Sequence, residues 1–284
     1  MLYYLHLLSE LDDWYSPLRV FKYITVRAVA GAGTAFLLSV ILGPWLINQL
    51  RRFNIGQYER KEEAPPLYAM HSHKQGTPTM GGILILMSIL ISTFLWTVPG
   101  NLYVSLAVAT LVFMGLVGFW DDYTKVALKR SKGLKARSKL ALQILWAIAV
   151  TFGLLCFPET SERAHELMVP FLKDPLVTDL GIVFIFLFVA LVLIGSTNAV
   201  NLTDGLDGLA VGCSSSVALS YLVFSYVAGH TIFSQYLKVP HVPGGGELAV
   251  FCGCMAGACL GFLWHNCHPA AVFMGDTGSL VLGF

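Results

Sequence analysis

The stretch 180–200 reads Leu-Gly-Ile-Val-Phe-Ile-Phe-Leu-Phe-Val-Ala-Leu-Val-Leu-Ile-Gly-Ser-Thr-Asn-Ala-Val and contains no charged side chain. A helix that crosses the hydrocarbon core of a bilayer needs about 20 predominantly apolar residues. Similar runs recur at 28–50, 79–98, 102–120, 139–157, 206–229 and 247–267, and an eighth begins at Gly278. The sequence therefore predicts an all-α fold, a polytopic membrane helix bundle with seven complete transmembrane helices and the start of an eighth.

The composition favours a single membrane domain over residues 1–284. Hydrophobic residues make up 56% of the chain and charged residues only 12%, whereas a soluble domain carries about 25% charged residues. The formal net charge of +1 gives no field that would attract nucleic acid. Because the chain stops at Phe284 inside an apolar run, we expect it to be incomplete at the C-terminus.

The first 27 residues mix aromatic and charged side chains before the first apolar run begins. They lack the basic start and the small-residue cleavage site of a signal peptide. Aromatic residues among charges are typical of the membrane–water interface. We therefore predict that residues 1–27 form an interfacial helical segment.

Basic residues in the loops predict the orientation in the membrane. Twelve of the 18 Lys and Arg residues fall in the loops after the first and third runs. The loop between the fourth and fifth runs has only Arg163 and Lys173, together with five acidic residues. Since cytoplasmic loops are enriched in Lys and Arg, the N-terminus is predicted to lie outside the cell.

Four polar segments lie at helix ends that this orientation places on the cytoplasmic side. They are Lys74-Gln-Gly-Thr-Pro-Thr-Met-Gly-Gly82, Gly118-Phe-Trp-Asp-Asp-Tyr123, Asn198-Ala-Val-Asn-Leu-Thr-Asp-Gly-Leu-Asp-Gly208 and the stretch 266–278. Apart from Lys74, the charge count did not use these segments, so their agreement supports both the orientation and a shared site.

Asp121 and Asp122 end the third run. Ionisable residues at membrane depth are costly and usually functional, and the helix dipole disfavours acids at a C-terminus. These two points favour a functional pair over a simple helix boundary.

Asn201, Asp204 and Asp207 recur at a spacing of three residues, which keeps neighbouring members within reach of one site if the segment is helical. The alternative is a capped helix start with Thr203 or Asp204 as N-cap. Capping explains one acid but not two acids and an asparagine.

Asp276 lies just before the eighth run and is either a functional carboxylate or a helix N-cap. Lys74 precedes Pro78, which suits the first helical position after a Thr77 cap. A helix start with Gly81 and Gly82 close by could receive a phosphate.

Together these segments bring five carboxylates to one membrane face. Like charges that converge at low dielectric repel by several kcal/mol, so a bridging cation is expected. Oxygen ligands suit Mg2+, which binds through carboxylates and substrate phosphates. The residues alone thus predict Mg2+-assisted phosphoryl transfer to or from a lipid-borne group.

The same segments resemble a known family. Gly76-Thr-Pro-Thr-Met-Gly-Gly82, Phe119-Trp-Asp-Asp122, the stretch 198–210 and Phe273-Met-Gly-Asp-Thr-Gly-Ser279 are similar to the phospho-N-acetylmuramoyl-pentapeptide-transferases. These enzymes belong to the polyprenyl-phosphate hexose-1-phosphate transferase superfamily. The resemblance covers essentially the whole chain in order.

The resemblance implies a multi-pass protein of the bacterial inner membrane whose active site faces the cytoplasm. The substrates it implies are UDP-N-acetylmuramoyl-pentapeptide and undecaprenyl phosphate, the products are lipid I and UMP, and the cofactor is Mg2+. The implied catalytic residues are Asp121 and Asp122, the implied metal ligands are Asp276 and Asn201, and the implied substrate-binding residues are Lys74, Asp204, Asp207, Asn266 and Phe273. The sequence leaves open whether two copies form a homodimer.

Two other interpretations remain at this point. A sister transferase that moves N-acetylglucosamine phosphate to the same lipid would share the aspartate motifs. A divalent-cation transporter would also hold acids within the membrane, but such sites usually lie at the bilayer midplane, whereas these acids lie at helix ends. The sequence also leaves open a one-step or a two-step transfer.

Overall fold

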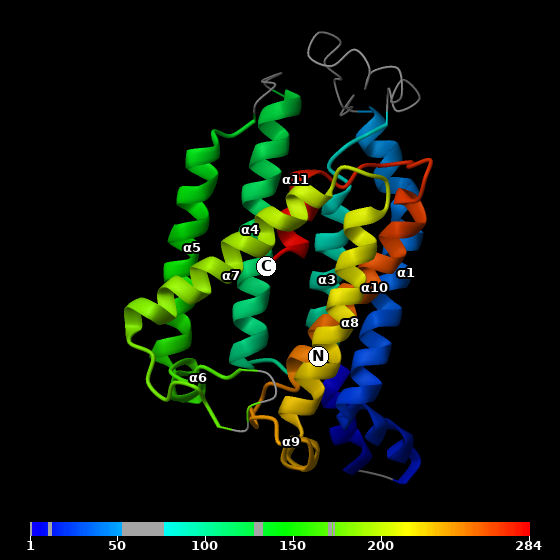
Figure 1. Cartoon of the computed structure of the whole chain (residues 1–284). Coiled ribbons are helices and arrows are strands. Elements are labelled where there is room, and N and C mark those ends of the chain that lie inside the picture. The colour runs from blue at the N-terminus through cyan, green and yellow to red at the C-terminus, as the bar shows by residue number, and fades with distance from the viewer. Residues whose placement is uncertain (1, 11–12, 53–76, 128–132, 170–171, 173) are drawn as a thin grey trace.

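The computed structural model describes residues 2–10, 13–52, 77–127, 133–169, 172 and 174–284, and their regular elements are helices (Figure 1). The elements are η1 (Leu2–Glu10), η2 (Asp13–Lys22), α1 (Ile24–Arg52), α3 (Gly82–Trp96), α4 (Leu102–Ala127), α5 (Ala136–Cys156), α6 (Pro158–Ala164), α7 (Ile182–Thr203), α8 (Leu209–Gly229), α9 (Thr231–Leu237), α10 (Glu247–Asn266) and α11 (Gly275–Leu282). The predicted all-α fold is confirmed for this part of the chain.

Six of these helices are long and apolar enough to span a membrane, namely α1, α4, α5, α7, α8 and α10. The seventh predicted run forms α3, which has 15 residues and rises by only about 22 Å at 1.5 Å per residue. The hydrocarbon core is about 30 Å thick. A count of seven complete spans therefore stays a prediction. The eighth run forms α11, which has 8 residues.

The N-terminal segment forms two short 3-10 helices, η1 and η2, and α1 begins directly after them at Ile24. The described residues thus contain two short helices where the sequence predicted one interfacial helical segment over 1–27. Its location in the membrane interface stays a prediction.

Helix α10 forms the centre of the bundle. In its most apolar stretch of 18 residues, 67% of α10 is buried inside the protein, whereas the corresponding share is 17% for α5 and for α7. Gly253, Gly257 and Gly261 let α10 approach the backbone of α1 closely, and a Cβ atom on Gly257 would lie 2.0 Å from the carbonyl oxygen of Ala32. Small residues at a spacing of four allow such close packing between membrane helices.

The bundle places the polar motifs at one end, which is the upper end in Figure 1. The last turns of α4, α7 and α10 and the first turns of α5 and α8 meet there, with α11 between them. The opposite end holds η1, η2, α6 and α9. There the Arg27 guanidinium on α1 pairs with the Glu247 carboxylate on α10 at 2.6 and 2.7 Å.

Candidate active site

Three aspartates from two helices meet at the motif end. Asp121 and Asp122 come from the last turns of α4, and Asp276 comes from the first turn of α11. Each offers a carboxylate oxygen within 4.8 Å of the other two. Only 3% of Asp121 and 3% of Asp122 is exposed, so these acids are buried rather than solvated at a helix boundary.

The Asp122 carboxylate caps the N-terminus of α11. It accepts hydrogen bonds from the backbone N–H of Asp276 at 3.1 Å and of Thr277 at 2.8 Å, and from the Thr277 hydroxyl at 2.7 Å. A carboxylate at a helix N-terminus satisfies free N–H groups and complements the dipole. The prediction that Asp276 is itself the N-cap is wrong, because Met274 occupies that position and Asp122 supplies the capping oxygens.

The Asp121 carboxylate points into a cavity instead. Its Oδ1 accepts a hydrogen bond from the backbone N–H of Leu134 at 2.8 Å, and its Oδ2 lies 2.5 Å from Nζ of Lys125, one turn further along α4. The segment before α5 passes close to Asp121 at Gly133, which has a φ of +55°. A Cβ atom at this position would lie 2.7 Å from Oδ1 of Asp121. The two neighbouring aspartates therefore have different surroundings.

Two lysines lie beside Asp276. Lys139 Nζ on α5 donates to Asp276 Oδ2 at 2.8 Å, and Lys125 Nζ lies 3.2 Å from the same oxygen. Burial acts to raise the pKa of Asp276, but the interaction with Asp121 and the charges of both lysines prevail and hold this pKa below its usual range. In the sequence, both lysines stand out only as basic residues of the loop after the third apolar run. The i, i+4 spacing of Asp121 and Lys125 was the available signal for one of them.

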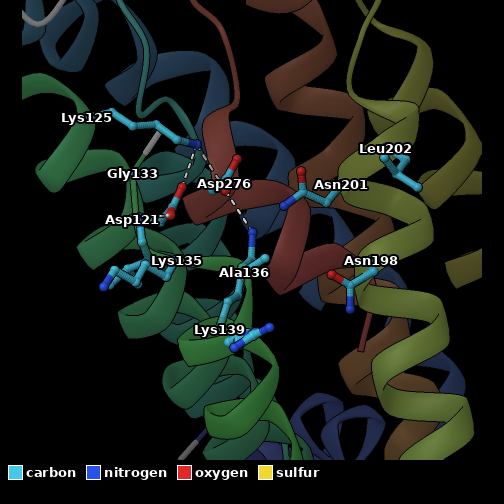
Figure 2. Close-up of a pocket in the computed structure, with 12 residues that line it drawn as sticks. Asp121, Lys125, Gly133, Lys135, Ala136, Lys139, Asn198, Asn201, Leu202 and Asp276 are labelled. Carbon is cyan, nitrogen blue, oxygen red and sulfur yellow. Dashed lines mark hydrogen bonds and ion pairs between the residues drawn. The ribbon is translucent and has the colours of Figure 1, made fainter. Parts of the chain in front are cut away.

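A cavity of about 710 Å³ opens beside these groups (Figure 2). Asp121 and Lys125 of α4 lie on one side of it, and Asn198, Asn201 and Leu202 of α7 lie on the other. Its remaining lining residues are Gly133, Leu134, Lys135, Ala136, Arg137, Lys139 and Asp276. The structure thus brings Asn201 and Asp276 to one cavity, as predicted, and adds basic side chains from the first turn of α5.

The stretch 204–208 is a turn between α7 and α8 and not a helix. Asp204 is the C-cap of α7, and Gly208 is the N-cap of α8, so the alternative in which Thr203 or Asp204 caps a helix start is wrong. Burial, followed by the charges of Asp276 and Asp122, raises the pKa of Asp204 to about 7.

Asp207 contacts the loop after α10. Its Oδ2 lies 3.1 Å from Nδ1 of His268 and 3.4 Å from the backbone N–H of Ala270. The turn thus places Asp207 against the loop after α10, while the pKa of Asp204 is raised by burial and by the charges of Asp276, Asp122 and Asp207.

The buried Asn266 amide joins the turn between α7 and α8 to the loop after α10. Its Oδ1 accepts from the backbone N–H of Gly208 at 3.0 Å, and its Nδ2 donates to the carbonyl of Val272 at 2.8 Å. Next to Val272, the half-buried Phe273 hydrogen-bonds through its backbone N–H to the carbonyl of Pro78 at 2.8 Å. Asn266 holds the loop that precedes Asp276, and any contact with substrate stays a prediction.

The predicted phosphate site at the start of α3 is not supported. Helix α3 begins at Gly82 and not at Pro78. The N–H groups of Gly81 and Gly82 donate to the carbonyls of Phe273 and Met274 at 2.9 and 2.8 Å, so they are not available to a ligand. Lys74 lies outside the described residues.

The donor set of the acid cluster fits a hard cation such as Mg2+. It consists of carboxylate oxygens, and Asn201 can add an amide oxygen from the opposite wall of the cavity. Lys125 and Lys139 already offset part of the negative charge in this site. A cation would therefore share Asp276 with two ammonium groups.

Comparisons with known proteins agree with the motifs. A family model described as glycosyl transferase family 4 matches residues 102–284, and a phospho-N-acetylmuramoyl-pentapeptide-transferase signature matches residues 74–86. The chain is 49% identical over 284 residues to the phospho-N-acetylmuramoyl-pentapeptide-transferase of Methylacidiphilum infernorum, covering 100% of this chain and 76% of that protein. The enzymes of the same name from Citrifermentans bemidjiense and Koribacter versatilis are 48% and 45% identical, over 100% and 95% of this chain and 76% and 73% of those proteins.

Proposed function

Because the chain belongs to the phospho-N-acetylmuramoyl-pentapeptide-transferase family, we propose that it transfers phospho-N-acetylmuramoyl-pentapeptide from its UDP-linked form to undecaprenyl phosphate. The products would be lipid I and UMP. The chain is a membrane phosphotransferase. The observation that carries the proposed reaction is the cavity in which Asp121, Asp276, Lys125 and Lys139 converge at the ends of membrane helices.

The lysines are the groups that this site offers to phosphate oxygens. Lys125 and Lys139 come from different helices and meet at one oxygen of Asp276. When a donor diphosphate enters, both ammonium groups can turn toward it from Asp276 and stabilise the charge that develops on the leaving UMP. Bound Mg2+ would be held by Asp276 with Asn201, and it would offset diphosphate charge.

Asp121 is placed to orient the acceptor. Its carboxylate is fixed by Leu134 and Lys125 and faces the cavity. In the proposed reaction an oxygen of the lipid phosphate attacks the sugar-proximal phosphorus, and the bond from that phosphorus to the oxygen of UMP breaks. Asp121 accepts a proton from any protonated acceptor phosphate and holds the phosphate in line. Asp122 acts differently, because it fixes α11 and thereby Asp276.

The remaining assignments concern the nucleotide. We assign Asp204, Asp207, Phe273 and Lys74 to the uridine side of the donor. Support comes from the position of Asp204 close to Asp276, which raises the pKa of Asp204. Asp207 faces the loop after α10, so its contact would be at the outer edge of the site.

The test is UMP release by the purified protein in detergent with Mg2+. UMP should appear only when both UDP-N-acetylmuramoyl-pentapeptide and undecaprenyl phosphate are present, and chelation of the metal should stop it. UMP release from UDP-N-acetylglucosamine instead would identify the sister transferase, and no release from either donor would contradict the proposal.

We also propose that the protein lies in the inner membrane with the cavity facing the cytoplasm. Two exposed free cysteines can test this orientation, because Cys267 follows α10 at the cavity end and Cys156 ends α5 at the opposite end. In single-cysteine variants, an impermeant thiol reagent should label Cys156 in spheroplasts and Cys267 in inverted vesicles. The reverse pattern would contradict the orientation.

A further inference from the structure

We propose that Gln143 is a positioning residue for the transfer reaction. It holds the amide of Asn198 so that the carbonyl oxygen of Asn198 faces the cavity and accepts a hydrogen bond from the bound substrate. This inference rests on the proposed function and extends it to Gln143 on α5 and Asn198 on α7.

Gln143 lies on α5, one turn below Lys139, and Asn198 lies on α7, three residues before Asn201. Only 1% of Gln143 is exposed. Burying an amide in apolar surroundings is costly unless its groups are hydrogen-bonded. The helix pair α5 and α7 is otherwise the least buried part of the bundle among its candidate spans, so a polar link at this depth calls for a specific explanation.

The hydrogen-bond pattern fixes the orientation of both amides. The carbonyl of Ile194 can only accept, so the Asn198 atom 2.8 Å from it is Nδ2. Nδ2 also lies 2.9 Å from Gln143, which must therefore present its acceptor Oε1. The Gln143 Nε2 then faces Oγ1 of Thr197 at 3.2 Å, and that hydroxyl donates its proton to the carbonyl of Leu193 at 2.6 Å.

Every donor and acceptor role in this network is consistent, and one polar atom is left over. Both protons of Asn198 Nδ2 are used, whereas Asn198 Oδ1 makes no hydrogen bond with any residue in the part of the chain that the structure describes. Asn198 lines the cavity, and Figure 2 shows its oxygen on the side of Ala136 and Lys139 while its nitrogen points deeper into the bundle. The network thus presents a single acceptor to the cavity, close to the acid cluster.

Loss of Gln143 would release that acceptor. Without Oε1 opposite Nδ2, the Asn198 amide keeps only its hydrogen bond to the Ile194 carbonyl, so its own carbonyl is held toward the cavity less firmly. A group aligned by a neighbouring hydrogen bond typically loses activity by about 10- to 100-fold when the neighbour is removed. We expect this loss in kcat more than in KM, because the donor diphosphate still has Lys125, Lys139 and Asp276.

The experiment compares Gln143→Met with a matched control. Trp146, on the next turn of α5, donates from Nε1 to Oγ1 of Thr110 at 3.1 Å, so Thr110→Val also removes one hydrogen bond between α5 and a neighbouring helix. Gln143→Met should lower kcat for UMP release by about 10- to 100-fold, and Thr110→Val should leave kcat close to wild type. Equal kcat losses in the two variants, or a normal kcat in Gln143→Met, would overturn the inference while wild-type activity still supports the proposed function.

A double-mutant cycle with Asn198→Leu gives a readout that a merely structural role would not move. If Gln143 acts through Asn198, Gln143→Met should cost little further kcat in the Asn198→Leu background. Additive losses would overturn the inference. Thr197→Val is a milder variant that keeps the side-chain shape and removes the acceptor for Gln143 Nε2 together with the hydroxyl's own bond to Leu193, and it should lower kcat in the same direction. A normal kcat in Thr197→Val together with additivity in the cycle would be decisive against the proposal.

Discussion

Asp122→Asn separates the roles of the two adjacent aspartates. The native carboxylate accepts three hydrogen bonds, of 3.1, 2.8 and 2.7 Å, from Asp276 and Thr277. An asparagine offers only one acceptor oxygen, so its NH2 group must face at least one N–H donor whichever way the amide turns. The substitution therefore leaves the N-terminus of α11 partly uncapped.

The expected cost follows from these contacts. A hydrogen bond to a charged acceptor contributes about 1.5–3 kcal/mol, and a neutral one about 0.5–1.5 kcal/mol. Losing one bond and weakening two others gives a gross loss of about 3 kcal/mol, and reduced repulsion among the acids offsets part of it. A net loss of about 2 kcal/mol would lower the thermal midpoint by about 4–8 °C.

Asp121→Asn should behave differently. Its amide oxygen can still accept from Leu134, and the lost partner Lys125 is 37% exposed and lies 3.2 Å from Asp276. Such a partly exposed pair contributes about 0–1 kcal/mol. We therefore expect Asp121→Asn to abolish most turnover with a nearly unchanged midpoint.

The assay is thermal unfolding in detergent, followed by tryptophan fluorescence, alongside UMP release for each variant. Thr277→Val is the matched control, because it removes only the hydroxyl bond to Asp122 and should cost about 1.5 kcal/mol. A midpoint for Asp121→Asn at or below that of Asp122→Asn would refute the division of roles.

Three further predictions use the same two assays. Lys139→Gln should lower turnover by about 100-fold while the midpoint changes little, and normal turnover would exclude a role in phosphate binding. Glu247→Gln should destabilise the fold by about 3–5 kcal/mol because it leaves Arg27 buried without its counter-charge, and Arg27→Met combined with Glu247→Leu should restore much of the loss; an unchanged midpoint in Glu247→Gln would contradict this. In metal-free protein, the raised pKa of Asp204 means that its contribution to stability is fully present below about pH 4 and is lost as pH rises through about 7. Asp204→Asn should therefore flatten the dependence of the thermal midpoint on pH in that range. Parallel pH dependences in the variant and the wild type would count against the raised pKa.

The sequence predicts the helices well and the local backbone at the site less well. Apolar runs locate α4, α7 and α10 because lipid-exposed helices must be apolar along their length. The turn at 204–208 and the late start of α3 escape prediction, since both depend on hydrogen bonds to the distant loop 267–274. The sequence signals for those two segments, a three-residue acid spacing and a Thr-Pro pair, are equally compatible with helices.

The three aspartates of the cluster can be identified from the sequence, but the charges that surround them cannot. Motif spacing identifies Asp121, Asp122 and Asp276, and the structure brings them together. No spacing places Lys139 on Asp276, because the two residues are 137 positions apart and meet only through the packing of α5 and α11. Likewise, Asp122 becomes a cap only because α11 ends up against α4.

This electrostatic difference changes the argument for a metal. Five converging acids would demand a cation in the free protein, but the structure pairs Asp121 and Asp276 with Lys125 and Lys139, and Asp122 accepts hydrogen bonds from the start of α11. The two lysines offset part of the acid charge, and a diphosphate would bring further negative charge into the same cavity. Demand for a divalent cation therefore increases on donor binding. By thermodynamic reciprocity, donor and cation should each increase the affinity of the other. The two lysines beside Asp276 suit this site to such coupling, because each ammonium group can turn from the Asp276 carboxylate to the incoming phosphates.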